Sequence, residues 1–282
     1  MRLLWATDIH LSHLKVAGAS RRFGEYLRDE QDFDAVLLTG DIATHGTLRD
    51  CLGDFAKAIG CRVYFVLGNH DYYDGSVAST RKLAVDLTEE VENLVWLDAE
   101  GVVLLDEQTA LVGVGGWYNA RTGNPEAHDF EMSDWYDIED LRLLTNYEIK
   151  AGIRQPIVEV CRRLADAAAK DGKRFLEEAL KQRKDVLFAT HYPPFPQAHL
   201  APTGRQGDST WSPWFVSVAM GEMLAEVAEA HPDNRITVLC GHTHTGTTYQ
   251  HFDNLVVRVG SAKYGIPDVE DVFELPIKWK SV

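Results

Sequence analysis

Aspartate, asparagine and histidine side chains that can bind metal ions are gathered in five short motifs. The motifs are Asp8-Ile9-His10, Gly40-Asp41, Gly68-Asn69-His70-Asp71, Thr190-His191-Tyr192 and Gly241-His242-Thr243-His244. Their carboxylate and amide oxygens and imidazole nitrogens, with no thiolate among them, suit Mn²⁺, Fe²⁺/Fe³⁺ or Zn²⁺. Bound cations of this kind activate water and polarise the bond that the water attacks. The motifs therefore predict a hydrolase that uses metal ions.

An apolar run that is typical of a buried strand precedes each of these motifs. The runs cover residues 3–6, 35–38, 63–67, 186–189 and 236–240. Polar residues that follow buried parallel strands meet at one edge of the sheet, where α/β proteins bind their ligands. We therefore expect the five motifs to form one site.

The segments between the strands show helical periodicity over 20–30, 48–59, 77–91, 155–184 and 216–230, with a break in the fourth near Asp171-Gly172. Alternation of strands and helices predicts βαβ units with a partly parallel sheet. Closely spaced short runs at 95–97, 102–105 and 111–114 favour hairpins. We interpret residues 1–282 as a single domain, with a cap or insert over 117–184. Two stretches, 117–147 and 193–213, are irregular and are therefore expected to be functional.

The acidic composition narrows the possible partners. With 28 Lys and Arg against 43 Asp and Glu, the formal net charge is −15. Long nucleic acids bind through clusters of basic residues, which this chain does not show, so we exclude them as ligands. No apolar run is long enough to cross a bilayer. Because a strand begins near Leu3, we expect no cleaved signal peptide and a cytoplasmic protein.

The order of the five motifs resembles that of the calcineurin-like metallophosphoesterases, and the resemblance covers residues 8–244. It implies an α/β (α+β) fold, a four-layer αββα sandwich of two mixed β-sheets flanked by helices, with an irregular or helical cap insert. It also implies two metal ions. By this resemblance Asp8, His10, Asp41 and His244 hold the first ion. The second is held by Asp41, Asn69, His191 and His242, with Asp41 bridging both.

The same resemblance implies a reaction on phosphate esters. A metal-bridging hydroxide attacks phosphorus in line, with no covalent enzyme intermediate. His70 protonates the leaving alkoxide as a general acid, and Asp71 orients and charge-stabilises His70. The expected substrate is a small phosphorylated molecule, with nucleotides among the candidates. Whether it is a monoester or a diester, and the oligomeric state, remain open at this point.

Several members of the superfamily offer alternative functions. The motif style is similar to bacterial cyclic-nucleotide-type phosphodiesterases. Ser/Thr-type protein phosphatases carry Glu at the position of Asp71 and arginines beside the motifs, whereas Tyr72-Tyr73 follow here. Purple acid phosphatases have an additional Tyr ligand shortly after the Gly-Asp motif, and residues 42–45 of this chain contain no Tyr. A non-catalytic scaffold that retains the fold is a further alternative, although here every ligand position is filled.

Other conspicuous residues have simpler interpretations. We expect His128, His199, His231 and His251 to be structural, and His13 and His45 to lie near the site without binding metal. Aromatic residues of the insert, Trp117, Tyr118, Trp135 and Tyr136, are expected to pack it onto the domain rather than to stack on a ligand. Arg121 and Arg205 are interpreted as surface cations.

Overall fold

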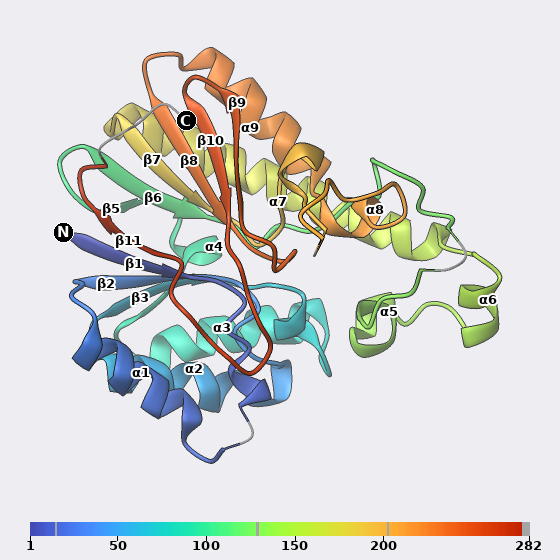
Figure 1. Ribbon diagram of the computed structural model, residues 1–282, viewed down its shortest axis with the longest axis horizontal. Coiled ribbons are helices and arrows are strands. Elements are labelled where there is room, and N and C mark those ends of the chain that lie inside the picture. The colour runs from blue at the N-terminus through green and yellow to red at the C-terminus, as the bar shows by residue number, and fades with distance from the viewer. Residues whose placement is uncertain (15, 128–129, 202, 278–282) are drawn as a thin grey trace.

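Two mixed β-sheets stack face to face in the computed structural model, which describes residues 1–14, 16–127, 130–201 and 203–277 (Figure 1). The first sheet has the order β11-β1-β2-β3-β4 and the second the order β5-β6-β7-β8-β10-β9. The first consists of β1 (Arg2–Ala6), β2 (Ala35–Thr39), β3 (Arg62–Val66), β4 (Leu94–Trp96) and β11 (Asp271–Glu274). The second consists of β5 (Val103–Leu104), β6 (Thr109–Gly113), β7 (Asp185–Ala189), β8 (Arg235–Cys240), β9 (Thr247–Phe252) and β10 (Leu255–Val259).

Helices cover the outer face of each sheet, which gives the expected αββα sandwich (Figure 1). The first sheet is covered by α1 (Ala19–Glu30), α2 (His45–Ile59) and α3 (Val77–Glu90), and the second by α7 (Gln155–Gln182) and α9 (Val218–Ala230). The short helices are α4 (Leu97–Glu100), α5 (Asp134–Asp137), α6 (Asn146–Lys150) and α8 (Ser212–Phe215). No helix in the described part of the chain is long and apolar enough to cross a membrane.

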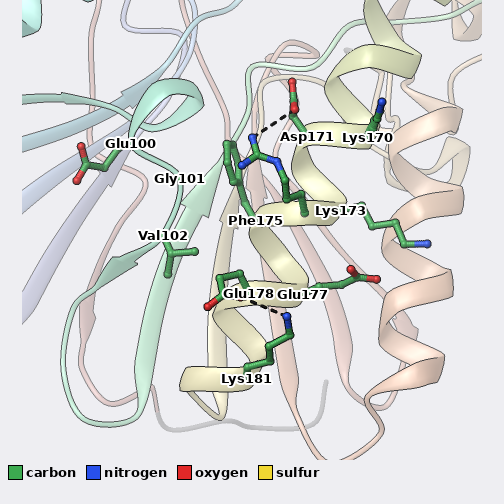
Figure 2. A pocket seen from close by; sticks show the side chains of 11 residues that line it. Glu100, Gly101, Val102, Lys170, Asp171, Lys173, Phe175, Glu177, Glu178 and Lys181 are labelled. Carbon is green, nitrogen blue, oxygen red and sulfur yellow. Dashed lines mark hydrogen bonds and ion pairs between the residues drawn. The ribbon is translucent and has the colours of Figure 1, made fainter.

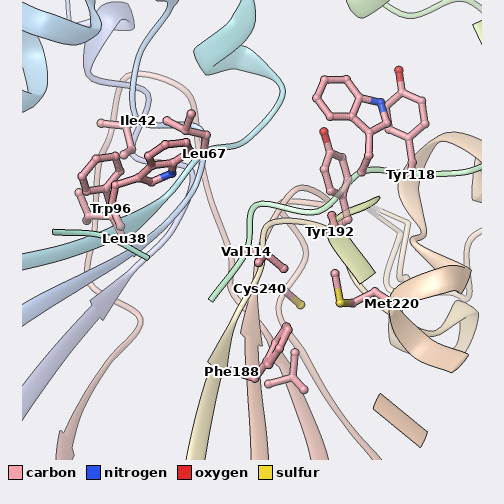
Figure 3. Packing of buried hydrophobic residues seen from close by; sticks show 14 of the residues in the cluster. Leu38, Ile42, Leu67, Trp96, Val114, Tyr118, Phe188, Tyr192, Met220 and Cys240 are labelled. Atoms are coloured by element: carbon pink, nitrogen blue, oxygen red, sulfur yellow. The ribbon is translucent and has the colours of Figure 1, made fainter. Parts of the chain in front are cut away.

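The strand sequences explain the layers, because alternate side chains point to opposite faces of a sheet. In β1, Leu3 and Trp5 belong to the cluster between the two sheets, whereas Leu4 and Ala6 belong to the larger cluster that also includes the helices. The same alternation occurs in β2 and β7. Figure 3 shows part of the larger cluster, including Phe188 of β7 and Met220 of α9. Both faces of the central strands are thus buried, which explains their continuous apolar runs.

Helix α7 is continuous over Gln155–Gln182, contrary to the break expected near Asp171-Gly172. A Cβ atom on Gly172 would lie 3.1 Å from the Phe188 ring and 3.3 Å from both Met223 and Val114. The glycine therefore allows α7 to pack closely against the second sheet and α9, and it does not end the helix. Tertiary packing outweighs its low helix propensity.

The short strands after α3 form only one of the expected hairpins. Strands β5 and β6 pair antiparallel, as expected. However, β4 pairs parallel with β3 in the first sheet, so β4 and β5 lie in different sheets and α4 connects them. Strands β9, β10 and β11, which the sequence analysis did not identify, complete both sheets.

The segment that carries α5 and α6 projects from one end of the sandwich (Figure 1). Its interior is organised by the buried Arg154 guanidinium, which donates hydrogen bonds to the carbonyls of Phe130 and Ile153 and lies 4.5 Å from the centre of the Trp135 ring. Trp117, Tyr118 and Trp135 are buried, so these aromatic residues pack the segment onto the domain, as expected.

Candidate metal centre

The five motifs meet where the carboxyl ends of the parallel strands of both sheets face each other. The first sheet supplies Asp8, Asp41 and Asn69, and the second supplies His191 and His242. Donor atoms of Asp8, His10, Asp41 and His244 form one compact group, within 4.8 Å of one another. Asp41, His191 and His242 form a second group by the same measure. Six of the seven expected metal ligands are therefore brought together, with Asp41 common to both groups, and the seventh, Asn69, has its Oδ1 3.1 Å from His191 Nε2.

The Asp41 carboxylate lies between the two groups, with one oxygen directed toward each. Its Oδ1 is 3.3 Å from His191 Nε2, and its Oδ2 is 3.8 Å from His10 Nε2. The backbone N–H of His70 also donates to Oδ1 at 2.9 Å, which fixes the carboxylate plane. A carboxylate held in this way can serve two cations at once.

Five of the expected ligands have backbone in the left-handed region. The φ angles are 49° for Asp8, 40° for His10, 52° for Asp41, 68° for His242 and 55° for His244. Such angles are uncommon outside glycine, although Asp and His tolerate them better than most residues. Each costs on the order of 1–3 kcal/mol, and such residues cluster at functional sites. These backbone conformations bring the side chains of the different motifs together at the two groups of donor atoms.

Glycines in the motifs keep that space free. Gly40 has a φ of 91°, and a Cβ there would meet the His191 ring. A Cβ on Gly68 would collide with the Asp41 carboxylate. Only glycine permits the backbone to approach the donors this closely.

Hydrogen bonds outside the site orient the two imidazoles of the second group. His191 Nδ1 donates to the Thr39 carbonyl at 2.9 Å, which leaves Nε2 free to bind a cation. His242 uses the opposite nitrogen, because its Nε2 donates to the Trp214 carbonyl at 3.2 Å and leaves Nδ1 free. Such outer contacts set the tautomer of a metal-binding histidine. Trp214 belongs to α8 and directly follows the second irregular stretch, and its role was not predicted from the sequence.

The Asn69 amide is oriented by Asp134, which the sequence analysis also missed. Asn69 Nδ2 donates to Asp134 Oδ1 at 2.9 Å, while Asn69 Oδ1 lies 3.1 Å from His191 Nε2. The Tyr73 hydroxyl donates to the same Asp134 oxygen at 2.7 Å. Burial and the Asp134 charge raise the pKa of Tyr73, so its hydroxyl remains a donor. Helix α5 of the projecting segment therefore reaches the metal centre.

The first group is braced through Asp8. Its carboxylate accepts hydrogen bonds from the Thr7 hydroxyl at 2.6 Å and from the backbone N–H of His242 at 3.1 Å. His244 Nε2 lies 3.2 Å from Asp8 Oδ1 and 3.1 Å from His10 Nε2. These contacts join the first sheet to the second directly at the donor atoms.

The electrostatics of the centre favour cations. Asp8, Asp41, Asp71 and Asp134 are all buried. Burial raises the pKa of the Asp41 carboxyl, and the negative charges of the other three aspartates raise it further. Burial lowers the pKa of His10 to about 3 and that of His191 and His242 below the usual value, so these imidazoles are neutral and able to bind metal. Two divalent cations would balance the four carboxylates, and the donor set fits them.

His70 and Tyr264 lie beside the two groups. His70 Nε2 is 3.8 Å from Asp41 Oδ2 and 3.4 Å from the Tyr264 hydroxyl, and its ring stacks on Tyr73 at 4.3 Å. The Tyr264 ring lies 4.4 Å from that of His10. Tyr264 is in the loop before β11, where no sequence pattern indicated a site residue.

Asp71 has a different position from the one expected. Its carboxylate accepts backbone hydrogen bonds from Ile42 at 2.9 Å, from Ala43 at 2.8 Å and from Gly68 at 2.8 Å. Among the described hydrogen bonds none joins it to the His70 ring, so the expected contact is not made. Asp71 instead ties the loop after β2 to the loop after β3, and thereby positions Asp41 relative to Asn69.

The family model of calcineurin-like phosphoesterases matches residues 1–246. The chain belongs to this family. It is therefore a metal-dependent hydrolase of phosphoester bonds, and the metal centre is that of a dinuclear family. No curated protein matches the chain in sequence.

Solved structures share the fold of this phosphoesterase at low sequence identity. A phosphopantetheinyl hydrolase from Mycobacterium tuberculosis is 16% identical, with a TM-score of 0.63 over 93% of this chain and 89% of that one. A dimetal phosphatase from Danio rerio is 14% identical, with a TM-score of 0.55 over 93% and 87%. These likenesses confirm the sandwich fold.

Of the other residues singled out in the phosphoesterase sequence, His13 is exposed but lies beside the centre, with its ring 5.5 Å from that of His10 and its donor atom grouped with those of His10 and His70. His199 is buried and stacks on Phe215, and His251 stacks on Phe195 at 4.1 Å, so both are structural as expected. His45 Nδ1 is hydrogen-bonded to Thr80. Arg121 pairs with Asp166 at 2.6 Å. His128 lies outside the described residues.

A larger groove runs along α7, away from the metal centre of the phosphoesterase (Figure 2). Its volume is about 700 Å³, and several of its charged side chains are paired with one another or with α9. The pairs are Lys173–Glu226, Arg174–Asp171 and Lys181–Glu178. Because positive and negative groups alternate along this face, the groove resembles an ordinary solvated helix surface.

Proposed function

We propose that this protein hydrolyses phosphate esters by direct attack of a water-derived hydroxide on phosphorus, at a centre of two cations. The observation that carries the proposal is the place of Asp41, which directs one oxygen toward His10 and the other toward His191. A single bridging carboxylate between two sets of imidazoles is suited to a pair of cations that act on the same substrate.

Each cation has its own donors in this proposal. Asp8, His10, Asp41 and His244 hold the first, and Asp41, Asn69, His191 and His242 hold the second. When bound, the cations lower the pKa of water to give hydroxide near neutral pH and offset charge on the phosphoryl oxygens. Nitrogen and oxygen donors without a thiolate favour Mn²⁺, Fe²⁺/Fe³⁺ or Zn²⁺.

His70 is the proposed general acid. Its Nε2 faces the Asp41 side of the cavity, where an ester oxygen would leave. Burial and the neighbouring His10 lower the pKa of the His70 imidazole well below its usual value, so the free site holds a neutral ring. A phosphate anion beside the ring raises this pKa, because negative charge stabilises imidazolium. The proton then passes from Nε2 to the departing alkoxide.

We also propose that the substrate is a small phosphorylated molecule, with nucleotides included, and that the protein works in the cytoplasm. The cavity at the centre is about 290 Å³ in volume, which suits a small ester better than a protein surface. Four free thiols, Cys51, Cys61, Cys161 and Cys240, support a reducing compartment.

The test is hydrolysis of bis(p-nitrophenyl) phosphate and p-nitrophenyl phosphate by Mn²⁺-loaded protein in ¹⁸O-water. We expect turnover that a chelator abolishes and Mn²⁺ restores, with one solvent oxygen added to phosphorus for each ester bond that is cleaved. Protein that binds both ions but turns over neither ester would overturn the proposal and favour a non-catalytic scaffold. Preferential turnover of a phosphoserine peptide would favour the protein phosphatase alternative.

A further inference from the structure

The walls of the cavity at the metal centre are apolar at both ends. Candidate ligands and His70 form the floor. The apolar surface of the walls comes from Tyr73, Met132, Phe215 and Tyr264, and the other lining residues are Ser133, Asp134 and Thr243. Of the described residues that line the cavity, none is a lysine or an arginine. Lys263, next to Tyr264 in sequence, is exposed and does not line it.

Each end of the cavity has its own aromatic residue. The Tyr264 ring lies 4.9 Å from the His244 ring, beside the first group of donors. The Phe215 ring lies 4.7 Å from the His242 ring, beside the second group. A phosphate placed over Asp41 would therefore have an apolar wall on either side of it. This arrangement offers a surface to two ester groups, whereas a monoester has only one.

The charge of the metal centre also affects which charge state of a phosphate ester it can bind. Two divalent cations bound at the centre would lie among four buried carboxylates, those of Asp8, Asp41, Asp71 and Asp134. A phosphodiester adds one negative charge, whereas a phosphomonoester adds up to two above its second pKa of about 6. A buried charge without a partner is costly, and no lysine or arginine among the described lining residues can offset the second charge.

From these features we infer that the centre selects phosphodiester monoanions that carry apolar or aromatic ester groups over phosphomonoester dianions. The inference rests on the proposed function and names its substrate class. The leaving ester oxygen lies near His70, between Tyr73 and Tyr264, and the retained ester group lies against Phe215 and Met132. Water adds to phosphorus, the P–O bond to the leaving group breaks, and the products are an alcohol and a phosphomonoester.

The experiment compares kcat/KM for bis(p-nitrophenyl) phosphate and p-nitrophenyl phosphate, which share one leaving group, in Mn²⁺-loaded protein at about pH 8, where both phosphates are fully ionised. We expect the diester to be preferred. Met132→Lys, which places a cation on the wall, should shift the ratio toward the monoester by roughly tenfold, equivalent to about 1.4 kcal/mol. Met132→Gln controls for size, and Gln182→Lys, at an exposed position on α7, controls for total charge. Gln182→Lys should leave the ratio unchanged, and Met132→Gln should shift it less than Met132→Lys does.

Equilibrium binding gives a second readout that does not depend on turnover. By calorimetry, the monomethyl ester of phenylphosphonate should bind the Mn²⁺-loaded protein more tightly than phenylphosphonate itself, and Met132→Lys should reduce the difference. A monoester preference in the wild type, or a Met132→Lys ratio equal to that of Met132→Gln, would overturn the inference alone. Failure to hydrolyse either ester would instead overturn the proposed function.

Discussion

The Asp134 carboxylate accepts a hydrogen bond from the Asn69 amide at 2.9 Å, and this contact turns the amide oxygen toward His191. Asp134 comes from α5, more than sixty residues after the motif that it serves. The Trp214 carbonyl of α8 fixes His242 in the same way. The first irregular stretch and the short helix at the end of the second thus orient ligands of the second group. None of the contacts described above for the first group involves either segment.

Asp134→Ala should weaken the second cation selectively. The Asn69 amide loses the acceptor that orients it, and changes of this kind typically reduce metal affinity by about 10–100-fold. Elemental analysis at limiting Mn²⁺ should find one tightly held ion, with the second lost on dialysis. Asp137→Ala, in the same helix, is the matched control and should retain both ions. Asp134→Asn keeps an acceptor oxygen and should recover most of the affinity. Equal loss of both ions would contradict this role for Asp134.

The five motifs and the strands before them could be predicted because each follows a buried, continuous apolar run. The order of the motifs was also sufficient to predict the sandwich fold and the candidate metal ligands that the structure brings together. Asp134, Trp214 and Tyr264 could not be found in this way, since they lie in segments without periodicity and one of them acts through its backbone carbonyl. The predicted break of α7 near Gly172 was wrong, because a glycine within a helix can allow close packing against neighbouring elements. The resemblance implied that Asp71 orients His70, but the Asp71 carboxylate accepts hydrogen bonds from three backbone amides instead.

Asp41→Asn should weaken both cations and abolish turnover. The substitution removes the charge of the carboxylate that faces both groups. Asp74→Asn is a suitable control, because Asp74 also has left-handed backbone, with a φ of 66° against 52° for Asp41, but does not line the cavity. Metal content and kcat/KM would be measured for both variants. Wild-type activity in Asp41→Asn would refute the bridging assignment.

His70→Ala should keep both ions and slow the hydrolysis of esters with poor leaving groups. Loss of a general acid typically costs about 10²–10⁴-fold, and the loss is smallest where the leaving group needs no proton. The measurement is kcat for a series of aryl phosphate diesters against leaving-group pKa. His13→Ala removes an exposed imidazole whose ring lies 6.4 Å from that of His70, and should leave the slope unchanged. A uniform loss across the series in His70→Ala would argue for a binding role instead.

His199 should make the fold less stable in acid. Burial lowers the pKa of His199 from 6.5 to about 4, against the opposing charge of Asp208. Between these values the unfolded chain takes up a proton that the folded chain does not, so stability falls as pH falls through this window. Urea unfolding in the presence of a chelator should show a smaller loss for His199→Gln than for the wild type between pH 6.5 and 4. Parallel losses would show that His199 titrates alike in both states.

Anomalous diffraction from crystals of the Mn²⁺-loaded protein, collected near the manganese absorption edge, tests the central claim most directly. We predict two peaks on either side of the Asp41 carboxylate, one among Asp8, His10 and His244 and the other among Asn69, His191 and His242. A single peak, or two peaks that do not share Asp41, would contradict the account.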